Sequence, residues 1–267
     1  MFDALYIAAT GMQAQQLNID TIANNLANLN TTGFKRARVS FGDLVARDAP
    51  VPAAVSEAQV AGATGLLATT PRIGCGVGIE GVAKVFDLGD VKQTGSAFDV
   101  AIRGDGLFEV EMPDGTHAYT RGGTLKVNAD GLLCSSSGYP IQPGVTVPAD
   151  ATGLSIGTDG RVHVSVPNQS TPIEVGQLQL VRFANPGGLT AQGNDQYQAS
   201  DASGEPIAAK PGEDGIGTLA QGYLEGSNVK LIDEMINLML AQRAYEASVK
   251  LVQASDEVLG LVNALRK

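Results

Sequence analysis

The sequence predicts an α+β protein: a discontinuous α-helical coiled-coil domain from both chain termini, an extended connector, and a central, mainly antiparallel β domain. Three observations predict this fold. Apolar residues recur every seventh position at both ends of the chain, alternate with a period of two in the middle, and follow no period in a Pro- and Ala-containing stretch before the middle. With 267 residues the chain is long enough for such cores without disulfides or metals.

The first helix is expected from Phe2 to about Leu29, because this stretch lacks Pro and carries a heptad pattern. The apolar residues of this seam are Leu5, Met12, Ile19, Ile22, Leu26 and Leu29. Apolar residues also lie off the seam, at Ile7 and Leu17, so one neighbouring helix would not cover all of them.

The first helix should end between Asn28 and Gly33. Asn and Thr side chains compete there for the backbone, and Gly33 can adopt the left-handed conformation that ends a helix. Lys35 and Arg36 are then expected beside the negative end of the helix dipole.

A second long helix is expected at the C-terminus. Ser227 or Asn228 is a candidate N-cap, and Asp233 and Glu234 fall in the first turns, where negative charge is favourable. Steps of four and three residues along this helix form a second apolar seam, whose predicted interface residues are Leu231, Met235, Leu238, Tyr245, Val249 and Val252.

The middle of the chain is predicted to form antiparallel strands. Side chains alternate over 98–103, 162–166 and 177–180, as in half-buried strands. Asp-Gly pairs at Asp114, Asp130 and Asp159 predict turns with positive φ. The predicted domains are residues 1–34 (inner helix), 35–95 (connector with β segments), 96–222 (outer β domain) and 223–267 (inner helix).

The connector contains a stretch, residues 45–78, in which Ala, Val, Gly, Thr and Pro follow no clear period. It ends in Gly74-Cys75-Gly76-Val77-Gly78, which resembles a phosphate loop but lacks the following Lys-Ser or Lys-Thr. The favoured interpretation is an extended strand or bulge where two backbones approach closely.

The charge of the chain opposes two classes of partner. The formal net charge of −10 disfavours nucleic acid and anionic membranes. The chain has no apolar stretch long enough to span a membrane and no ordinary secretory signal at its start, so we expect neither membrane insertion nor a cleaved signal peptide.

No catalytic, cofactor-binding or metal site is predicted. His117 and His163 are isolated, and Cys75 and Cys134 are interpreted as small buried hydrophobes, with a disulfide left open. The expectation is a self-assembling structural subunit and not an enzyme.

Three motifs, in order, resemble bacterial flagellar rod and hook proteins. The first covers Ala23–Asn28 and Thr31–Arg36, the second Phe98–Gly106 with Tyr119–Arg121, and the third Gly222–Val229 followed by Gln242–Glu246. Ile7–Met12, Ala14–Gln16 and the length are most similar to distal-rod members of the family, whereas Val45–Pro71 departs from the expected pattern.

The resemblance implies that both termini form the innermost layer of a hollow tube around an export channel, and that the tube crosses the periplasm and transmits torque. It implies homo-oligomerisation, contact with neighbouring rod and hook proteins, bushing rings and a rod cap, and export without a cleaved signal by the flagellar type III apparatus. No cofactor is implied.

Three alternatives stay open at this stage. The helices could pack as an intramolecular antiparallel hairpin on the domain between them. The chain could be a hook-type or proximal-rod subunit of the same family. It could also be a periplasmic carbohydrate-active β domain with helical oligomerisation arms, for which Glu109 and Glu111 are the best carboxylate pair.

Overall fold

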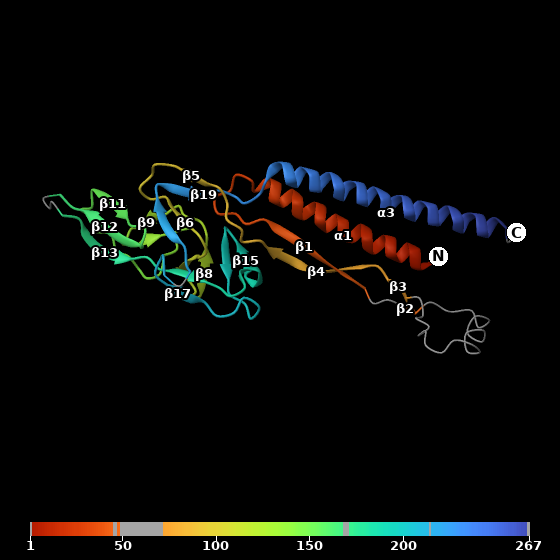
Figure 1. Cartoon of the computed structure of the whole chain (residues 1–267), viewed down its shortest axis with the longest axis horizontal. Helices are drawn as coiled ribbons and strands as arrows, with labels where there is room; N and C mark the ends of the chain where they lie inside the picture. The colour runs from red at the N-terminus through yellow and green to blue at the C-terminus, as the bar shows by residue number, and fades with distance from the viewer. Residues whose placement is uncertain (1, 45–46, 49–71, 168–170, 214, 266–267) are drawn as a thin grey trace, which may run out of the picture. The chain divides into compact units, whose positions relative to one another are not determined.

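The computed structural model describes residues 2–44, 47–48, 72–167, 171–213 and 215–265. Most of the predicted aperiodic stretch, including residues 49–71, therefore lies outside the described residues. The described chain combines two long helices with a set of short, antiparallel strands, so the predicted α+β class is confirmed (Figure 1).

The two helices are α1 (Phe2–Ala27) and α3 (Leu231–Leu265). Helix α1 ends next to the predicted stop, and Gly33 has a φ of 75°. Helix α3 begins at Leu231, so neither Ser227 nor Asn228 caps it, and that prediction is wrong. The Asn228 amide instead bonds to backbone groups of two other segments, described below.

The chain divides into two compact units, and the four boundaries between them fall within α1, β1, β4 and α3. The first unit contains residues 1–22, 39–82 and 235–267, and the second contains 23–38 and 83–234. Within the first unit, α1 and α3 lie side by side and antiparallel (Figure 1), close enough that a Cβ on Gly11 would lie 3.6 Å from Ser248 Oγ. The boundaries predicted at residues 34, 95 and 222 stay a prediction.

Two narrow ribbons flank the aperiodic stretch. Strand β1 (Ala37–Asp43) pairs with β4 (Val77–Lys84), and β2 (Arg47–Asp48) pairs with β3 (Arg72–Ile73). Just before β4, Gly76 has a φ of 112°, and a Cβ there would lie 2.5 Å from Thr10 Oγ1. Val77 and Gly78 begin β4, as the strand interpretation predicted, whereas the atom nearest to Gly76 belongs to a side chain and not to a second backbone.

Two larger sheets form the body of the second unit. One has the order β15 (Thr190–Gly193), β16 (Gln196–Gln198), β8 (His117–Thr120) and β7 (Phe108–Glu111), and the other the order β11 (Gly153–Ile156), β12 (Arg161–Ser165) and β13 (Ile173–Gln177). Every pairing between these strands is antiparallel.

Four antiparallel strand pairs complete the unit, with a short 3₁₀ turn η1 (Pro186–Gly188) before β15. The pairs are β6 (Val100–Arg103) with β18 (Thr218–Gln221), β5 (Val91–Gln93) with β19 (Tyr223–Glu225), β9 (Lys126–Val127) with β10 (Leu133–Cys134), and β14 (Leu180–Arg182) with β17 (Ile207–Ala209).

The core of the second unit is aliphatic, with a smaller aromatic cluster beside it. Val100, Phe108, Val162 and Leu180 are fully buried members of the main cluster. In the smaller cluster Tyr119 meets Phe183 edge to face, with ring centroids 4.8 Å apart. Inward side chains of alternating strands build both clusters, as the period of two predicted.

The individual strand predictions are mostly confirmed. Strands β6 and β12 lie within or overlap the predicted segments 98–103 and 162–166, and Gly115, Gly131 and Gly160 have positive φ. The predicted strand 177–180 is wrong, because Leu178 and Gln179 lie between β13 and β14. The Leu178 N–H bonds to Gly160 O instead, and its side chain is fully buried.

Candidate assembly site

The predicted interface residues differ widely in exposure. Ile22 is buried in the chain, while Leu231, Met235 and Tyr245 are exposed. The remaining predicted residues are half-buried: Leu5, Met12, Ile19, Leu26, Leu29, Leu238, Val249 and Val252. Their burial between subunits stays a prediction.

The least exposed face of α3 coincides only in part with the predicted seam. Its buried positions are Glu234 and Ala241, followed by half-buried Ser248 and Ser255 at the same spacing. These residues are small or polar, but half-buried Leu238 and Val252 lie four residues after Glu234 and Ser248 on the same side of the helix. The pairing of α1 and α3 as a coiled coil is therefore not established by this structure.

Large apolar side chains cover other faces of α3. Ile232 is 72% exposed, Leu240 63% and Leu251 61%. Further exposed apolar side chains on the helix are Ile236, Met239, Val258, Leu261 and Val262. Apart from Val262, which continues the seam after a phase slip at Asp256, these residues lie off the heptad seam, and the sequence pattern therefore did not select them.

A buried ion cluster lies in the second unit, and we call it the clasp: Lys35, Arg121 and Glu225. Lys35 Nζ lies 2.7 Å from Glu225 Oε1 and donates a second bond of 2.7 Å to the carbonyl oxygen of Asp87. All three clasp side chains are at most 4% exposed. The prediction that Lys35 faces the helix dipole is wrong, because the ion pair and this carbonyl account for its ammonium.

Arg121 holds the opposite side of the clasp. Its Nε donates to Glu225 Oε2, and its two terminal nitrogens donate to the carbonyl oxygens of Ile102, Gly104 and Gly106. Since Gly104 and Gly106 both have positive φ, the loop presents these carbonyls to one guanidinium. Arg121 thus supplies hydrogen-bond donors to carbonyl oxygens at the end of β6 and in the loop that follows β6.

Backbone groups close the clasp around Glu225. The Gly89 N–H donates to Glu225 Oε1 at 2.9 Å, and the Gly33 N–H donates to the carbonyl oxygen of Glu225 at 2.9 Å. A side chain is excluded at Gly89, where a Cβ would lie 2.2 Å from Gly226 O. The segments that follow α1 and precede α3 are therefore held against each other.

Two buried or half-buried asparagines complete these links. Asn25, in the last turns of α1, donates to Ala37 O at 2.9 Å and accepts from Ala37 N at 2.8 Å. Asn228 accepts from Arg36 N at 2.7 Å and donates to Val85 O at 2.8 Å. Each amide thereby replaces a strand partner for the extended segment that it contacts.

The electrostatics of the clasp favour an ionised Glu225. Burial acts to raise the pKa of Glu225, but Arg121 and Lys35 outweigh it, and the pKa lies below its usual value. Burial lowers the pKa of Lys35, against the opposing effect of Glu225. Two cations and one anion leave one net positive charge, which the carbonyl oxygens around Arg121 and Lys35 solvate.

Lys84, the last residue of β4, contacts the backbone of the clasp residue Lys35. Its Nζ donates to Lys35 O at 2.8 Å and lies 4.1 Å from the centroid of the Phe34 ring. Burial lowers the pKa of Lys84, although Asp195 opposes this shift. The cation–π contact fixes Phe34 next to the clasp.

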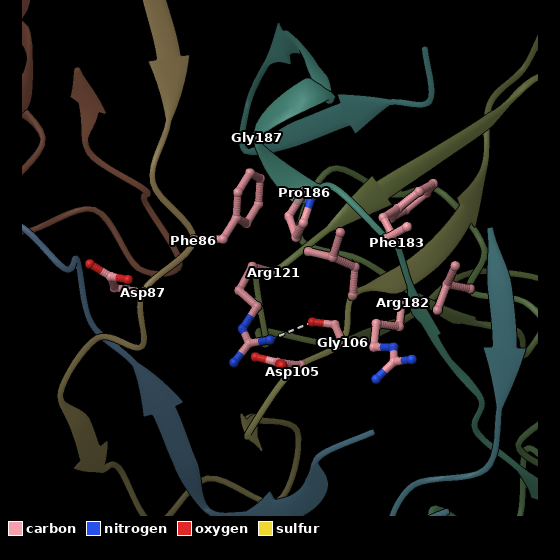
Figure 2. A pocket seen from close by; sticks show the side chains of 12 residues that line it. Phe86, Asp87, Asp105, Gly106, Arg121, Arg182, Phe183, Pro186 and Gly187 are labelled. Carbon is pink, nitrogen blue, oxygen red and sulfur yellow. Dashed lines mark hydrogen bonds between the residues drawn. The ribbon is translucent and has the colours of Figure 1, made fainter. Parts of the chain in front are cut away.

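A cavity of about 540 Å³ opens beside Arg121. Figure 2 shows Phe86, Pro186 and Phe183 around one part of it and the charged side chains of Asp105, Arg121 and Arg182 around another. The residues that line it include no Ser, Cys, Lys or His, and the Arg121 guanidinium is already bonded to carbonyl oxygens. The lining therefore offers no hydroxyl, thiol, amine or imidazole group, and its acidic side chains are those of Asp87 and Asp105.

The other sequence candidates for chemistry lie apart from this cavity. Glu109 Oε1 lies 3.1 Å from His117 Nδ1, and Glu111 accepts a hydrogen bond from Gln142 at 2.7 Å. His163 lies within β12. Both cysteines are free thiols, and burial raises the pKa of Cys134.

Within the described ranges, no group of three or more His, Cys, Asp or Glu side chains is arranged to hold a metal ion. Over the same part of the chain, no helix is long and apolar enough to cross a membrane.

Three family models match the chain: a flagella basal body rod protein model at residues 5–35, a flagellar hook protein FlgE/F/G D1 domain at 101–164, and a flagellar basal body rod FlgEFG C-terminal model at 220–265. The flagellar basal-body rod protein FlgG of Borreliella burgdorferi is 41% identical over 100% of both chains. The protein of that name from Caulobacter vibrioides is 41% identical over 98% of this chain and 99% of its own.

The chain belongs to the flagellar basal-body rod protein FlgG family. It is a structural subunit of the rod that polymerises with other axial proteins, and it is not an enzyme. The predictions of a distal-rod subunit and of the flagellar resemblance are confirmed. A carbohydrate-active domain is not supported, since the relatives are structural proteins.

The rod family's motifs meet at the clasp. Lys35 comes from the first motif, Arg121 from the second and Glu225 from the third. The sequence analysis did not link the three residues, and it placed Lys35 at the helix dipole, because isolated charges far apart in a sequence carry no periodic signal. Their position within the motifs was the one signal that could have linked them.

Proposed function

We propose that this rod subunit assembles into a hollow tubular homopolymer in which α1 and α3 form the inner layer around the export channel. The exposed apolar side chains of α3 carry this proposal. A stable monomer rarely leaves so many large apolar side chains in water along one helix. Burying each of them contributes about 1.5–3 kcal/mol, so contact with neighbouring copies would stabilise the polymer strongly.

The exposed residues of α3 point in more than one direction around the helix. Ile232, Ile236 and Leu240 are four residues apart, and Met235 and Met239 form a second row beside them. Two rows suit a subunit that contacts several neighbours, as a helical lattice requires. Within the chain α1 and α3 do lie antiparallel, as the hairpin alternative expects, but this pairing leaves the two rows exposed, and that exposure supports assembly in addition to the pairing.

The finer placement of the subunit belongs to the same proposal. The tube is a distal-rod drive shaft that crosses the periplasm and transmits torque, in contact with neighbouring rod and hook proteins, the bushing rings and the rod cap. The flagellar type III apparatus exports the chain without cleavage of a signal peptide. Membership of the rod family and the resemblance of the three motifs support these statements.

Electron microscopy of the purified full chain tests the proposal. On concentration it should form straight, hollow filaments in which α3 lines the lumen. Curved filaments would favour the hook-type alternative. A folded chain that stays monomeric at every concentration and on seeding would refute self-assembly.

A further inference from the structure

We propose that the clasp is a positioning device for assembly: Lys35, Arg121 and Glu225 fix the points where α1 leaves and α3 enters the β-rich unit. This inference rests on the proposed function and assigns a role to residues remote from the apolar interface. Lys35 and Glu225 are 190 positions apart in sequence, yet their side chains join the two segments that carry the helices.

The distance along the chain from the clasp to each helix is short. Helix α1 ends at Ala27, a short distance before Lys35 in the sequence. Helix α3 begins at Leu231, a short distance after Glu225. Between them, Asn25 binds Ala37, Asn228 binds Arg36, and Gly33 binds the backbone of Glu225. A shift at the clasp is therefore passed directly to both helix ends.

The composition of the clasp points to specificity more than to stability. Removing three charges from water opposes folding, and well-packed apolar residues often replace a buried ion cluster at no loss of stability. Apolar contacts, unlike hydrogen bonds, do not fix the relative orientation of the groups that meet. The carboxylate of Glu225 takes bonds from Lys35, Arg121 and Gly89 at once, so only one arrangement of these segments satisfies all of them.

A fixed orientation of these segments is important in a polymer. Every subunit must present its helices at the same angle, because an error of an ångström at one contact repeats along the lattice. The clasp also needs all three segments, so it forms only after the chain has been delivered as far as Glu225. The helix ends are then held in place by contacts that an incomplete chain lacks.

The test compares single and double variants. Glu225→Gln alone leaves the two buried cations Lys35 and Arg121 without their anion, and the melting temperature should fall by about 6–20 °C. The double variant Lys35→Met, Glu225→Gln keeps one net positive charge, that of Arg121, as in the wild type. Asn228 still donates to Asp87 O at 3.1 Å, so this carbonyl keeps a partner in the double variant.

The double variant should therefore melt cooperatively, within about 6 °C of the wild type. Its filaments should elongate at least tenfold more slowly on wild-type seeds, and amide exchange should quicken at residues 25–37 and 226–234 but not in β6 to β8. A core variant, Val162→Ala, serves as the control for stability alone. Val162 is fully buried and lies in the main core cluster, away from the clasp.

The Val162→Ala chain should melt lower yet elongate at the wild-type rate. If the double variant elongates as fast as Val162→Ala, the positioning role is wrong while the proposed function stands. If the double variant loses its cooperative transition, the clasp acts on stability and the inference is overturned. A folded wild type that never polymerises would overturn both proposals.

Discussion

Asn25 and Ala37 exchange two hydrogen bonds, from Nδ2 to the carbonyl oxygen at 2.9 Å and from the backbone N–H to Oδ1 at 2.8 Å. The side chain of Asn25 thus pairs with a backbone segment as a neighbouring strand would. Since Asn25 is only 1% exposed, water cannot replace these bonds when the amide is removed.

Asn25→Ala should therefore lower the free energy of unfolding by about 2–4 kcal/mol, because two backbone groups lose their partners. Urea denaturation measures this change. Asn24→Ala is the matched control: Asn24 is exposed, and its side chain accepts one exposed hydrogen bond from half-buried Asn28, so a change within about 0.5 kcal/mol is expected. Equal effects of the two substitutions would contradict the role of Asn25.

The stability of the subunit should depend on pH through Glu225. Burial acts to raise its pKa, but Arg121 and Lys35 bring it below the ordinary value of 4.5. Between the two pKa values the unfolded chain binds more protons than the folded chain. The stabilisation is therefore fully present above pH 4.5 and is lost as the pH falls through the folded-state pKa.

Urea midpoints measured from about pH 5 to about pH 3 report this loss. The double variant Lys35→Met, Glu225→Gln lacks the titrating group, so its midpoint should fall less steeply. Val162→Ala should keep the wild-type slope at a lower midpoint. Parallel slopes for the wild type and the double variant would show that Glu225 does not carry the dependence.

Gly123 allows the closest backbone approach in the second unit. A Cβ there would lie 1.9 Å from Val100 O, in a segment where Val100 N donates to Gly123 O at 2.9 Å. Gly123→Ala should lower the free energy of unfolding by about 3 kcal/mol, because the backbone segment around residue 123 must move away from β6. Thermal or urea unfolding gives the value.

Gly144→Ala is the control for that substitution. It lies in the same unit and on the surface, its φ is not positive, and an added Cβ would meet only Leu132 at 3.7 Å. A change between zero and a stabilisation of about 1 kcal/mol is expected. Similar losses at both glycines would mean that backbone freedom, and not the close approach, decides the effect.

The sequence predicted the fold class and the strands well because these depend on local periodicity. The end of α1 was predictable because Gly33 has a local conformational role. Asn228 was misassigned as a helix cap because capping is the common local use of asparagine before a helix, whereas here it bonds to Arg36 and Val85. Contacts between distant segments left no periodic trace.

The interface on α3 shows the same limit. The heptad rule selected Met235 and Val249 as seam residues, but the helix turns Ala241 and Ser248 toward its least exposed face. Small residues carry no hydrophobic signal, so the pattern could not find the face that they form. Leu240 and Leu251 were omitted for the opposite reason, since they are apolar but lie off the seam.

Exposure decides which substitution separates assembly from folding. Leu26 and Val249 are half-buried within the chain, so an aspartate at either position would disturb folding as well as assembly. Leu240 is 63% exposed, and Leu240→Asp should leave the melting temperature of the monomer within about 2 °C of the wild type.

The effect of Leu240→Asp should appear in the polymer. Removing about 1.5–3 kcal/mol of burial per subunit raises the critical concentration for polymerisation about 10- to 150-fold. Sedimentation of filaments over a concentration series measures that threshold. Asn237→Asp adds the same carboxylate one turn earlier on an exposed position without removing an apolar group, so its threshold should stay within about threefold. If both variants raise the threshold equally, added charge and not lost apolar contact governs assembly. If neither does, the exposed apolar rows of α3 are not the surface through which rod subunits associate.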